Sequence, residues 1–141
     1  MMYAREMKKE DLPRLREIFL KVRTAAFAWD KTETYKLEDF DKQTIDEEVL
    51  LIEEEGEILG FVSTYVPDSF IHHLFVDTTK SRKGVGSQLI AEALNRIELP
   101  ATLKCVTENE KALAFYAKEG WVKTIQEKDD GISYWVMKYT N

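Results

Sequence analysis

The hydrophobic positions of this 141-residue chain change their period several times, and each change predicts an element. Alternating or continuous short apolar runs predict strands, whereas apolar residues three or four positions apart predict helices. The predicted strands cover residues 2–8, 49–54, 58–66, 70–77, 101–106, 121–128 and 132–139. The predicted helices run from about Asp11 to Val22, over 36–43, from Gly84 toward a stop at Pro100, and over 109–120. This order, β-α-(α)-β-β-β-α-β-α-β-β, favours an α/β (α+β) fold with one sheet and helices on its faces.

Turn-forming residues support these boundaries. Pro13 suits the first turn of a helix, where its missing N–H is not needed. The pair Glu55-Gly56 and the segment 129–131, "DDG", predict the turns of two antiparallel hairpins. Asn109 and Gly120 are typical residues at the start and the stop of a helix. No repeat or linker interrupts the chain, so we expect a single domain over residues 1–141.

The composition, 44% hydrophobic and 33% charged, is that of a soluble globular protein. A formal net charge of −6 argues against nucleic-acid binding, which needs a basic face. We find no apolar core of a secretory signal and no apolar run long enough to cross a bilayer. Cys105 is the one cysteine and cannot form an internal disulfide. We therefore expect a cytoplasmic protein with no membrane partner.

The segment 80–89, "KSRKGVGSQL", lies between a predicted strand and a predicted helix. It lacks the spacing G-x-x-x-x-G-K-[ST] of a P-loop, and Leu89 replaces the third glycine of a dinucleotide-binding fingerprint. Two interpretations remain open. The segment is a solvated surface turn, or its glycines and cations form an anion cradle at the N-terminus of a helix.

Two longer segments decide how we interpret this loop. The segment 70–90, "FIHHLFVDTTKSRKGVGSQLI", resembles motif A of the GCN5-related N-acetyltransferase (GNAT) superfamily. The segment 103–122, "LKCVTENEKALAFYAKEGWV", resembles motif B of the same superfamily. The resemblance implies a mixed, mostly antiparallel sheet of six or seven strands, flanked by helices and splayed between strands 4 and 5.

The same resemblance implies an acetyl-CoA-dependent N-acetyltransferase that moves the acetyl group directly to a primary amine of a small molecule. The coenzyme A pyrophosphate would bind to the loop residues Arg82, Lys83, Gly84, Val85, Gly86 and Ser87. The pantetheine arm would bind to Asn109 and to the backbone of Leu74, Phe75 and Val76. Tyr116 matches the residue that protonates the departing thiolate. Ser81 stands where the family usually has Gln or Arg, which puts the affinity for coenzyme A in question.

A general base is needed, because a lysine-like amine is mostly protonated at neutral pH. His72 and His73 are the only histidines, and one of them is a candidate because a neutral imidazole accepts a proton near pH 7. Strand alternation predicts that they lie on opposite faces. Glu33, Glu47 and Glu48 are further candidates that the sequence does not rank.

Several further expectations concern ligands and partners. Aromatic residues in the segment 27–40 favour a small, partly apolar amine as acceptor. Cys105 lies in phase with Leu103, which predicts a buried residue, and the lack of a Cys/His cluster predicts no metal. Tyr134 and Trp135 in the last hairpin are compatible with a homodimer. Two rival functions stay open: a non-catalytic acyl-CoA-binding or regulatory module, and an enzyme that acetylates protein N-termini or lysines.

Overall fold

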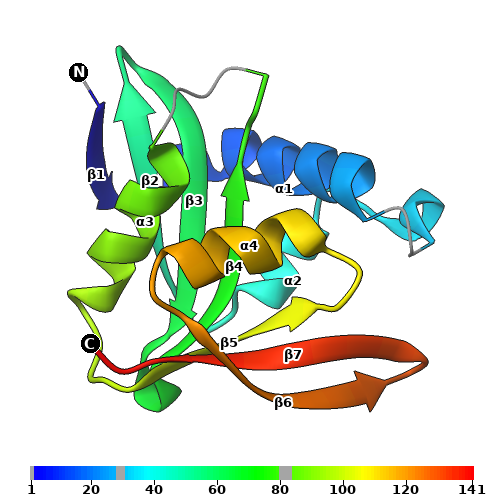
Figure 1. The fold of residues 1–141 in the computed structure, drawn as a ribbon. Coiled ribbons are helices and arrows are strands. Elements are labelled where there is room, and N and C mark those ends of the chain that lie inside the picture. Colours follow the sequence, from blue (N-terminus) through cyan, green and yellow to red (C-terminus); the bar gives the residue numbers. More distant parts are fainter. Residues whose placement is uncertain (1, 28–30, 80–83) are drawn as a thin grey trace.

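The computed structural model describes residues 2–27, 31–79 and 84–141 (Figure 1). Within these residues, seven strands form one sheet in the order β1-β2-β3-β4-β5-β7-β6. The strands are β1 (Met2–Glu6), β2 (Glu48–Glu54), β3 (Glu57–Tyr65), β4 (Phe70–Val76), β5 (Ala101–Val106), β6 (Val122–Asp129) and β7 (Ile132–Tyr139). Neighbouring strands are antiparallel except β4 and β5, which are parallel. The predicted mixed, mostly antiparallel sheet is confirmed.

Four α-helices and three 3₁₀ turns are present in the described residues. The α-helices are α1 (Leu12–Ala26), α2 (Asp39–Gln43), α3 (Val85–Leu94) and α4 (Glu110–Lys118). The turns are η1 (Lys9–Asp11), η2 (Thr32–Thr34) and η3 (Val66–Asp68). Among these helices, none is long and apolar enough to span a membrane.

The helix predicted over residues 36–43 is shorter in the structure. α2 begins at Asp39, whose carboxylate accepts a hydrogen bond of 2.9 Å from the backbone N–H of Lys36. An aspartate that bonds to the backbone before it favours a turn at that place, and so delays the helix. Phe40, which is fully buried, then fixes α2 against the sheet.

The sheet carries a separate hydrophobic core on each face. On one face, α3 and α4 cover residues of β2 to β5 and of β7, with Leu89, Ile90 and Met137 at the centre. On the other face, α1 and α2 cover a second core, in which Phe19 and Phe61 are fully buried. Figure 1 shows the helices on their two sides of the sheet.

The sheet opens in its middle, as the resemblance implied. β4 and β5 are paired only at Phe70–Thr102 and Ile71–Leu103. Beyond these pairs the two strands diverge, and α4 crosses in front of the gap (Figure 1). Every other pair of neighbouring strands is longer, so this is the one place in the described sheet where an extended ligand can approach the edge of an interior strand.

Candidate active site

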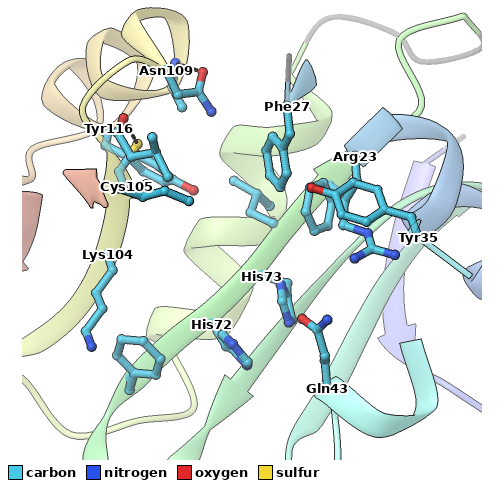
Figure 2. A pocket seen from close by; sticks show the side chains of 16 residues that line it. Arg23, Phe27, Tyr35, Gln43, His72, His73, Lys104, Cys105, Asn109 and Tyr116 are labelled. Carbon is cyan, nitrogen blue, oxygen red and sulfur yellow. Dashed lines mark hydrogen bonds between the residues drawn. The ribbon is translucent and has the colours of Figure 1, made fainter. Parts of the chain in front are cut away.

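The gap between β4 and β5 forms a cleft of about 570 Å³. This volume is within the range typical of sites for small ligands. Figure 2 shows its two walls. The labelled residues of one wall are Lys104, Cys105, Asn109 and Tyr116, and those of the other are Arg23, Phe27, Tyr35, Gln43, His72 and His73.

The N-terminus of α3 supplies backbone donors beside the end of β4. Gly84 precedes the helix with φ of 96°, in the left-handed region that favours glycine. The first intrahelical hydrogen bond runs from the N–H of Gln88 to the carbonyl of Gly84, at 3.0 Å. The N–H groups of Val85, Gly86 and Ser87 precede this bond, so they are available to an anion.

The two glycines of the loop have different surroundings. A Cβ on Gly84 would meet no atom within 4 Å, whereas a Cβ on Gly86 would lie 3.3 Å from Cζ of Phe115. Gly86 therefore allows α3 to pack closely against α4. The hydroxyl of Ser87 donates to the carboxylate of Glu119 at 2.9 Å, which leaves its backbone N–H as the group for an anion.

Arg82 and Lys83, the two cationic residues predicted to bind the pyrophosphate, lie outside the described residues, as does Ser81.

The edge of β4 and the start of α4 lie on the same cleft. Leu74 and Phe75 line it, and over residues 74–76 the β5 side of β4 has no paired strand. Asn109 caps α4, because its Oδ1 accepts a hydrogen bond of 3.3 Å from the N–H of Ala112. Capping uses the amide oxygen and leaves the NH₂ group for a ligand.

Tyr116 and Cys105 face the cleft from α4 and β5 (Figure 2). Burial, with a smaller effect of Cys105, raises the pKa of the Tyr116 hydroxyl well above its ordinary value. This hydroxyl is therefore a proton donor at neutral pH. Burial also raises the pKa of the Cys105 thiol to about 11, so Cys105 is not a thiolate nucleophile near pH 7.

The prediction that His72 and His73 lie on opposite faces of the strand is wrong. In the pairing of β3 with β4, Ser63 is opposite His73 and Thr64 is opposite Ile71. His72 is therefore the extra residue of a β-bulge, which breaks the alternation of side chains. The two imidazole rings are stacked with their centroids 3.8 Å apart, and both line the cleft.

His73 is the buried member of this pair. Its ring packs edge-on against Phe19, with the centroids 4.9 Å apart. Burial, together with the charges of His72 and Arg23, lowers the pKa of His73 to about 3. A hydrogen bond to the backbone of Gln43 acts in the opposite direction and is weaker. His73 is therefore neutral at physiological pH.

His72 has a carboxylate partner that the sequence did not single out. Its Nδ1 lies 2.6 Å from Oε2 of Glu47, whose side chain is only 8% exposed. A carboxylate accepts at that distance from an N–H, so the proton is on Nδ1 and the lone pair of the neutral ring is on Nε2. The other two candidates do not share this position: Glu48 lies 3.7 Å from Arg96, and Glu33 is exposed on η2.

The absence of a metal stays a prediction, but the fold brings together three side chains of the kinds that ligate metals. Potential ligand atoms of Glu47, His72 and His73 all lie within 4.8 Å of one another. The bulge and the turn before β2 assemble this group, and sequence spacing does not indicate it. The 2.6 Å contact between Glu47 and His72 is that of a hydrogen bond, and we interpret the group as a hydrogen-bonded one.

The wall opposite Lys104 is completed by α1 and the segment after it. The guanidinium of Arg23 is 4.0 Å from the ring centroids of both Phe19 and Tyr35. It also donates to the carboxylate of Asp39 at 3.1 Å, which connects α1 to α2. Arg23 is only 5% exposed, so this wall is a packed unit of aromatic rings and one ion pair.

Comparison with known families identifies this architecture. Residues 21–141 match the family model described as an acetyltransferase (GNAT) domain. The chain belongs to the GNAT acetyltransferase family. No significant match to a curated protein sequence was found.

Solved structures share the GNAT fold over nearly the whole chain. Apo YjaB from Escherichia coli is 22% identical with a TM-score of 0.79, and the match covers 99% of this chain and 97% of that one. YncA from Salmonella typhimurium, solved with its cofactor acetyl-CoA, is 17% identical with a TM-score of 0.74, over 99% and 94%. PaiA N-acetyltransferase from Thermoplasma acidophilum, in complex with coenzyme A, is 16% identical with a TM-score of 0.73, over 100% and 99%. At these identities the likeness establishes the GNAT fold.

Proposed function

We propose that this GNAT chain transfers an acetyl group from acetyl-CoA directly to a primary amine of a small molecule. The observation that carries the proposal is the opening between β4 and β5, where an unpaired strand edge and a buried tyrosine line one cleft. The N-terminus of α3 lies beside the end of β4, where a Cβ on Gly86 would be 3.9 Å from Cγ2 of Val76. Two of the similar structures were solved with acetyl-CoA or coenzyme A bound, which supports this donor.

The donor side of the cleft fits a pyrophosphate joined to an extended arm. We define the donor side as residues 84–87, the edge of β4 over 74–76, Asn109 and Tyr116. Free backbone N–H groups at a helix N-terminus suit the pyrophosphate. An open strand edge suits an extended arm with amide groups, which adds to the sheet like a further strand.

The chemistry then needs one proton donor and one proton acceptor from the protein. The co-substrate supplies the acetyl group as a thioester with an electrophilic carbonyl carbon. The amine nitrogen bonds to this carbon, and the carbon–sulfur bond breaks with its electron pair on sulfur. Tyr116 donates its proton to this sulfur and takes one from the newly bonded nitrogen, so the products are a neutral amide and a thiol. Binding the amine and the thioester next to each other in the reactive orientation increases the rate further.

The acceptor side favours a small amine with an apolar part. We define the acceptor side as Arg23, Tyr35, Glu47, His72 and His73. Phe27, Tyr35 and Phe70 also line the cleft and offer aromatic surface. A ligand amine attached to an aromatic or alkyl group would bury that group there.

Calorimetric titration with acetyl-CoA and with coenzyme A tests the donor side. We expect micromolar binding by the wild-type protein and a loss of at least about 100-fold in Gly84→Glu, because a carboxylate there repels the pyrophosphate. Gly56→Glu is the matched control: Gly56 also has positive φ and open space around its Cβ, but lies in the turn between β2 and β3. Equal weakening in both variants, or no wild-type binding, would contradict the proposal.

Release of free thiol in the presence of a panel of primary amines tests turnover. Release that depends on the amine supports the transferase. Binding without release from any amine identifies the non-catalytic acyl-CoA-binding module. Faster release with peptide N-termini or lysine peptides than with small amines identifies a protein acetyltransferase.

A further inference from the structure

The Glu47–His72 contact is a feature that the donor chemistry does not use. It joins two segments far apart in the chain: the turn before β2 and the bulge of β4. Another ion pair of the described protein near this cleft, Arg23–Asp39, connects α1 to α2. We propose that His72 is the general base for the acceptor amine and that Glu47 is the positioning residue that orients and supports it. This inference rests on the proposed function.

Local structure holds Glu47 in place. The turn after α2 is closed by a hydrogen bond from the N–H of Thr44 to the carbonyl of Phe40, at 3.1 Å. Asp46 then adopts a φ of 64°, and the N–H of Glu47 donates to the carbonyl of Thr44 at 3.0 Å. Phe40 is fully buried, so the turn is anchored to the core. Main-chain hydrogen bonds therefore hold both ends of the turn and fix the backbone of Glu47.

Packing alone does not explain why the carboxylate of Glu47 is buried. The side chain of Glu47 is 8% exposed, and its Oε1 has no hydrogen-bond partner in the described protein. Burial of a carboxylate oxygen without a partner is unfavourable, so such an atom calls for an explanation. A carboxylate that supports a cationic imidazole during turnover explains it, because its full charge is used when His72 is protonated.

The β-bulge gives His72 the geometry of a base. It brings His72 to the cleft, while Nδ1 is held by Glu47. The side chain of His72 is 36% exposed, so Nε2 can be reached by an acceptor. The lone pair on Nε2 takes a proton from the ammonium group of the acceptor. The resulting neutral amine attacks the thioester, and the imidazolium later gives its proton to solvent.

His73 does not compete for this role. Its pKa is lowered and its Nε2 is buried without a partner, so it stays neutral and stacks on His72. The other titratable groups that line the cleft are Arg23 from α1, Tyr35 after η2, Lys104 and Cys105 from β5, and Tyr116 from α4. Arg23 and Lys104 disfavour a third positive charge on the site, and the carboxylate of Glu47 offsets their effect on the imidazolium formed during turnover.

A double-mutant cycle tests whether Glu47 acts through His72. Acetylation of phenylethylamine, or of the best amine in the panel, is measured in the presence of EDTA. At pH 7 we expect His72→Gln to lower kcat/KM by about 10²–10³-fold and Glu47→Leu by about 10–100-fold. In the His72→Gln background, Glu47→Leu should have no further effect. Binding of acetyl-CoA should not change in any of these variants.

Two controls separate charge from orientation. Glu47→Gln keeps an oxygen acceptor for Nδ1 and should lose less activity than Glu47→Leu. Glu48→Gln removes the neighbouring carboxylate, which faces Arg96, and should retain full activity. For the His72 variant we expect log kcat/KM to rise with pH until the amine itself is deprotonated, whereas the wild-type profile levels off earlier.

Nitrogen-15 NMR of His72 in the full-length protein gives a readout independent of turnover. At alkaline pH we expect the wild-type ring to carry its proton on Nδ1, and Glu47→Leu to shift the population toward the Nε2–H tautomer. If no amine is acetylated, the proposed function fails, while the tautomer still reports on the pair. Additive losses in the cycle, an unchanged tautomer in Glu47→Leu, or activity that EDTA abolishes and Zn²⁺ restores would each overturn the inference.

Discussion

The donor side of the cleft is built mostly from backbone groups, whereas the acceptor side is built from side chains. On the donor side, the N–H groups of residues 85–87 and the edge of β4 offer the same contacts whatever side chains surround them. On the acceptor side, α1, the turn before β2 and the bulge of β4 each contribute one or two side chains. We therefore expect donor binding to tolerate changes of side chain and the choice of acceptor to depend on them.

The largest effect is expected for Tyr116→Phe, the one donor-side change that removes a reacting side chain. We expect kcat to fall about 10²–10³-fold, equivalent to about 3–4 kcal/mol, because the departing thiolate loses its proton donor. The affinity for acetyl-CoA should stay the same. Thiol release and calorimetry measure the two quantities. Tyr3→Phe, on β1 and away from the cleft, is the control. A parallel loss of binding and turnover would mean that Tyr116 is a packing residue.

The next effect is expected on the acceptor side, for Arg23→Met. This change leaves the carboxylate of Asp39 without its ion-pair partner and removes a cation from between two aromatic rings. We expect the free energy of unfolding in urea to fall by about 2–3 kcal/mol. Arg16→Met is the matched control, because Arg16 also joins α1 to an aspartate of α2 but is 34% exposed. Its loss should be below about 1 kcal/mol, and equal losses in both would contradict a packed acceptor wall.

A smaller, pH-dependent effect is expected from His73. Its folded pKa of about 3 is below the ordinary value of 6.5, so between these values the unfolded chain binds more protons than the folded one. Stability is therefore complete above pH 6.5 and decreases on acidification, by at most about 1.4 kcal/mol per pH unit. Urea unfolding at pH 6.5 and at pH 5 should show this decrease in the wild type and a weaker one in His73→Phe.

Asp77 does not contribute to the loss of stability between pH 6.5 and pH 5. Burial alone would raise the pKa of Asp77, but hydrogen bonds from Thr79, Arg14 and Lys21 lower it well below 3.8. That carboxylate contributes stability that is present above about pH 4 and is lost only as the pH falls below it. Identical slopes in the wild type and His73→Phe would show that His73 is not held neutral by burial.

The smallest effect is expected for Cys105→Ala. The thiol is 6% exposed and burial raises its pKa to about 11, so we expect that it does not carry the acetyl group. We expect an unchanged kcat and a loss of about 1 kcal/mol in stability from the small cavity. Mass spectrometry of the wild type during turnover should find no acetylated Cys105. An acetylated cysteine, with turnover lost in the variant, would replace direct transfer by a covalent intermediate.

Much of the fold follows from local patterns. The strands and helices lie close to their predicted residues because apolar periodicity and turn residues act over a few positions. Gly84 and Asn109 were predicted at their places for the same reason, since a left-handed turn and a helix cap are local conformations. Arg82 and Lys83 stay predictions, because they lie outside the described residues.

On the acceptor side, local sequence patterns did not predict the positions of the side chains. Simple alternation placed His72 and His73 on opposite faces, but the bulge opposite Ser63–Thr64 put both rings on the cleft. A bulge is a property of two paired strands, and no residue of β4 by itself signals it. Glu47 stood among three unranked glutamates for the same reason, because its partner is 25 residues away in the chain.

The sequence by itself determined the order of the elements, the GNAT motifs and thus the backbone groups of the donor side. Each of these depends on residues that are close in the chain, where propensity and spacing decide the conformation. Only the tertiary structure decided which carboxylate meets which histidine, which histidine is buried and neutral, and how Arg23 closes the acceptor wall. Those contacts join segments that the chain separates by many residues, and they form only when the sheet has set its register and α1 and α2 have packed upon it.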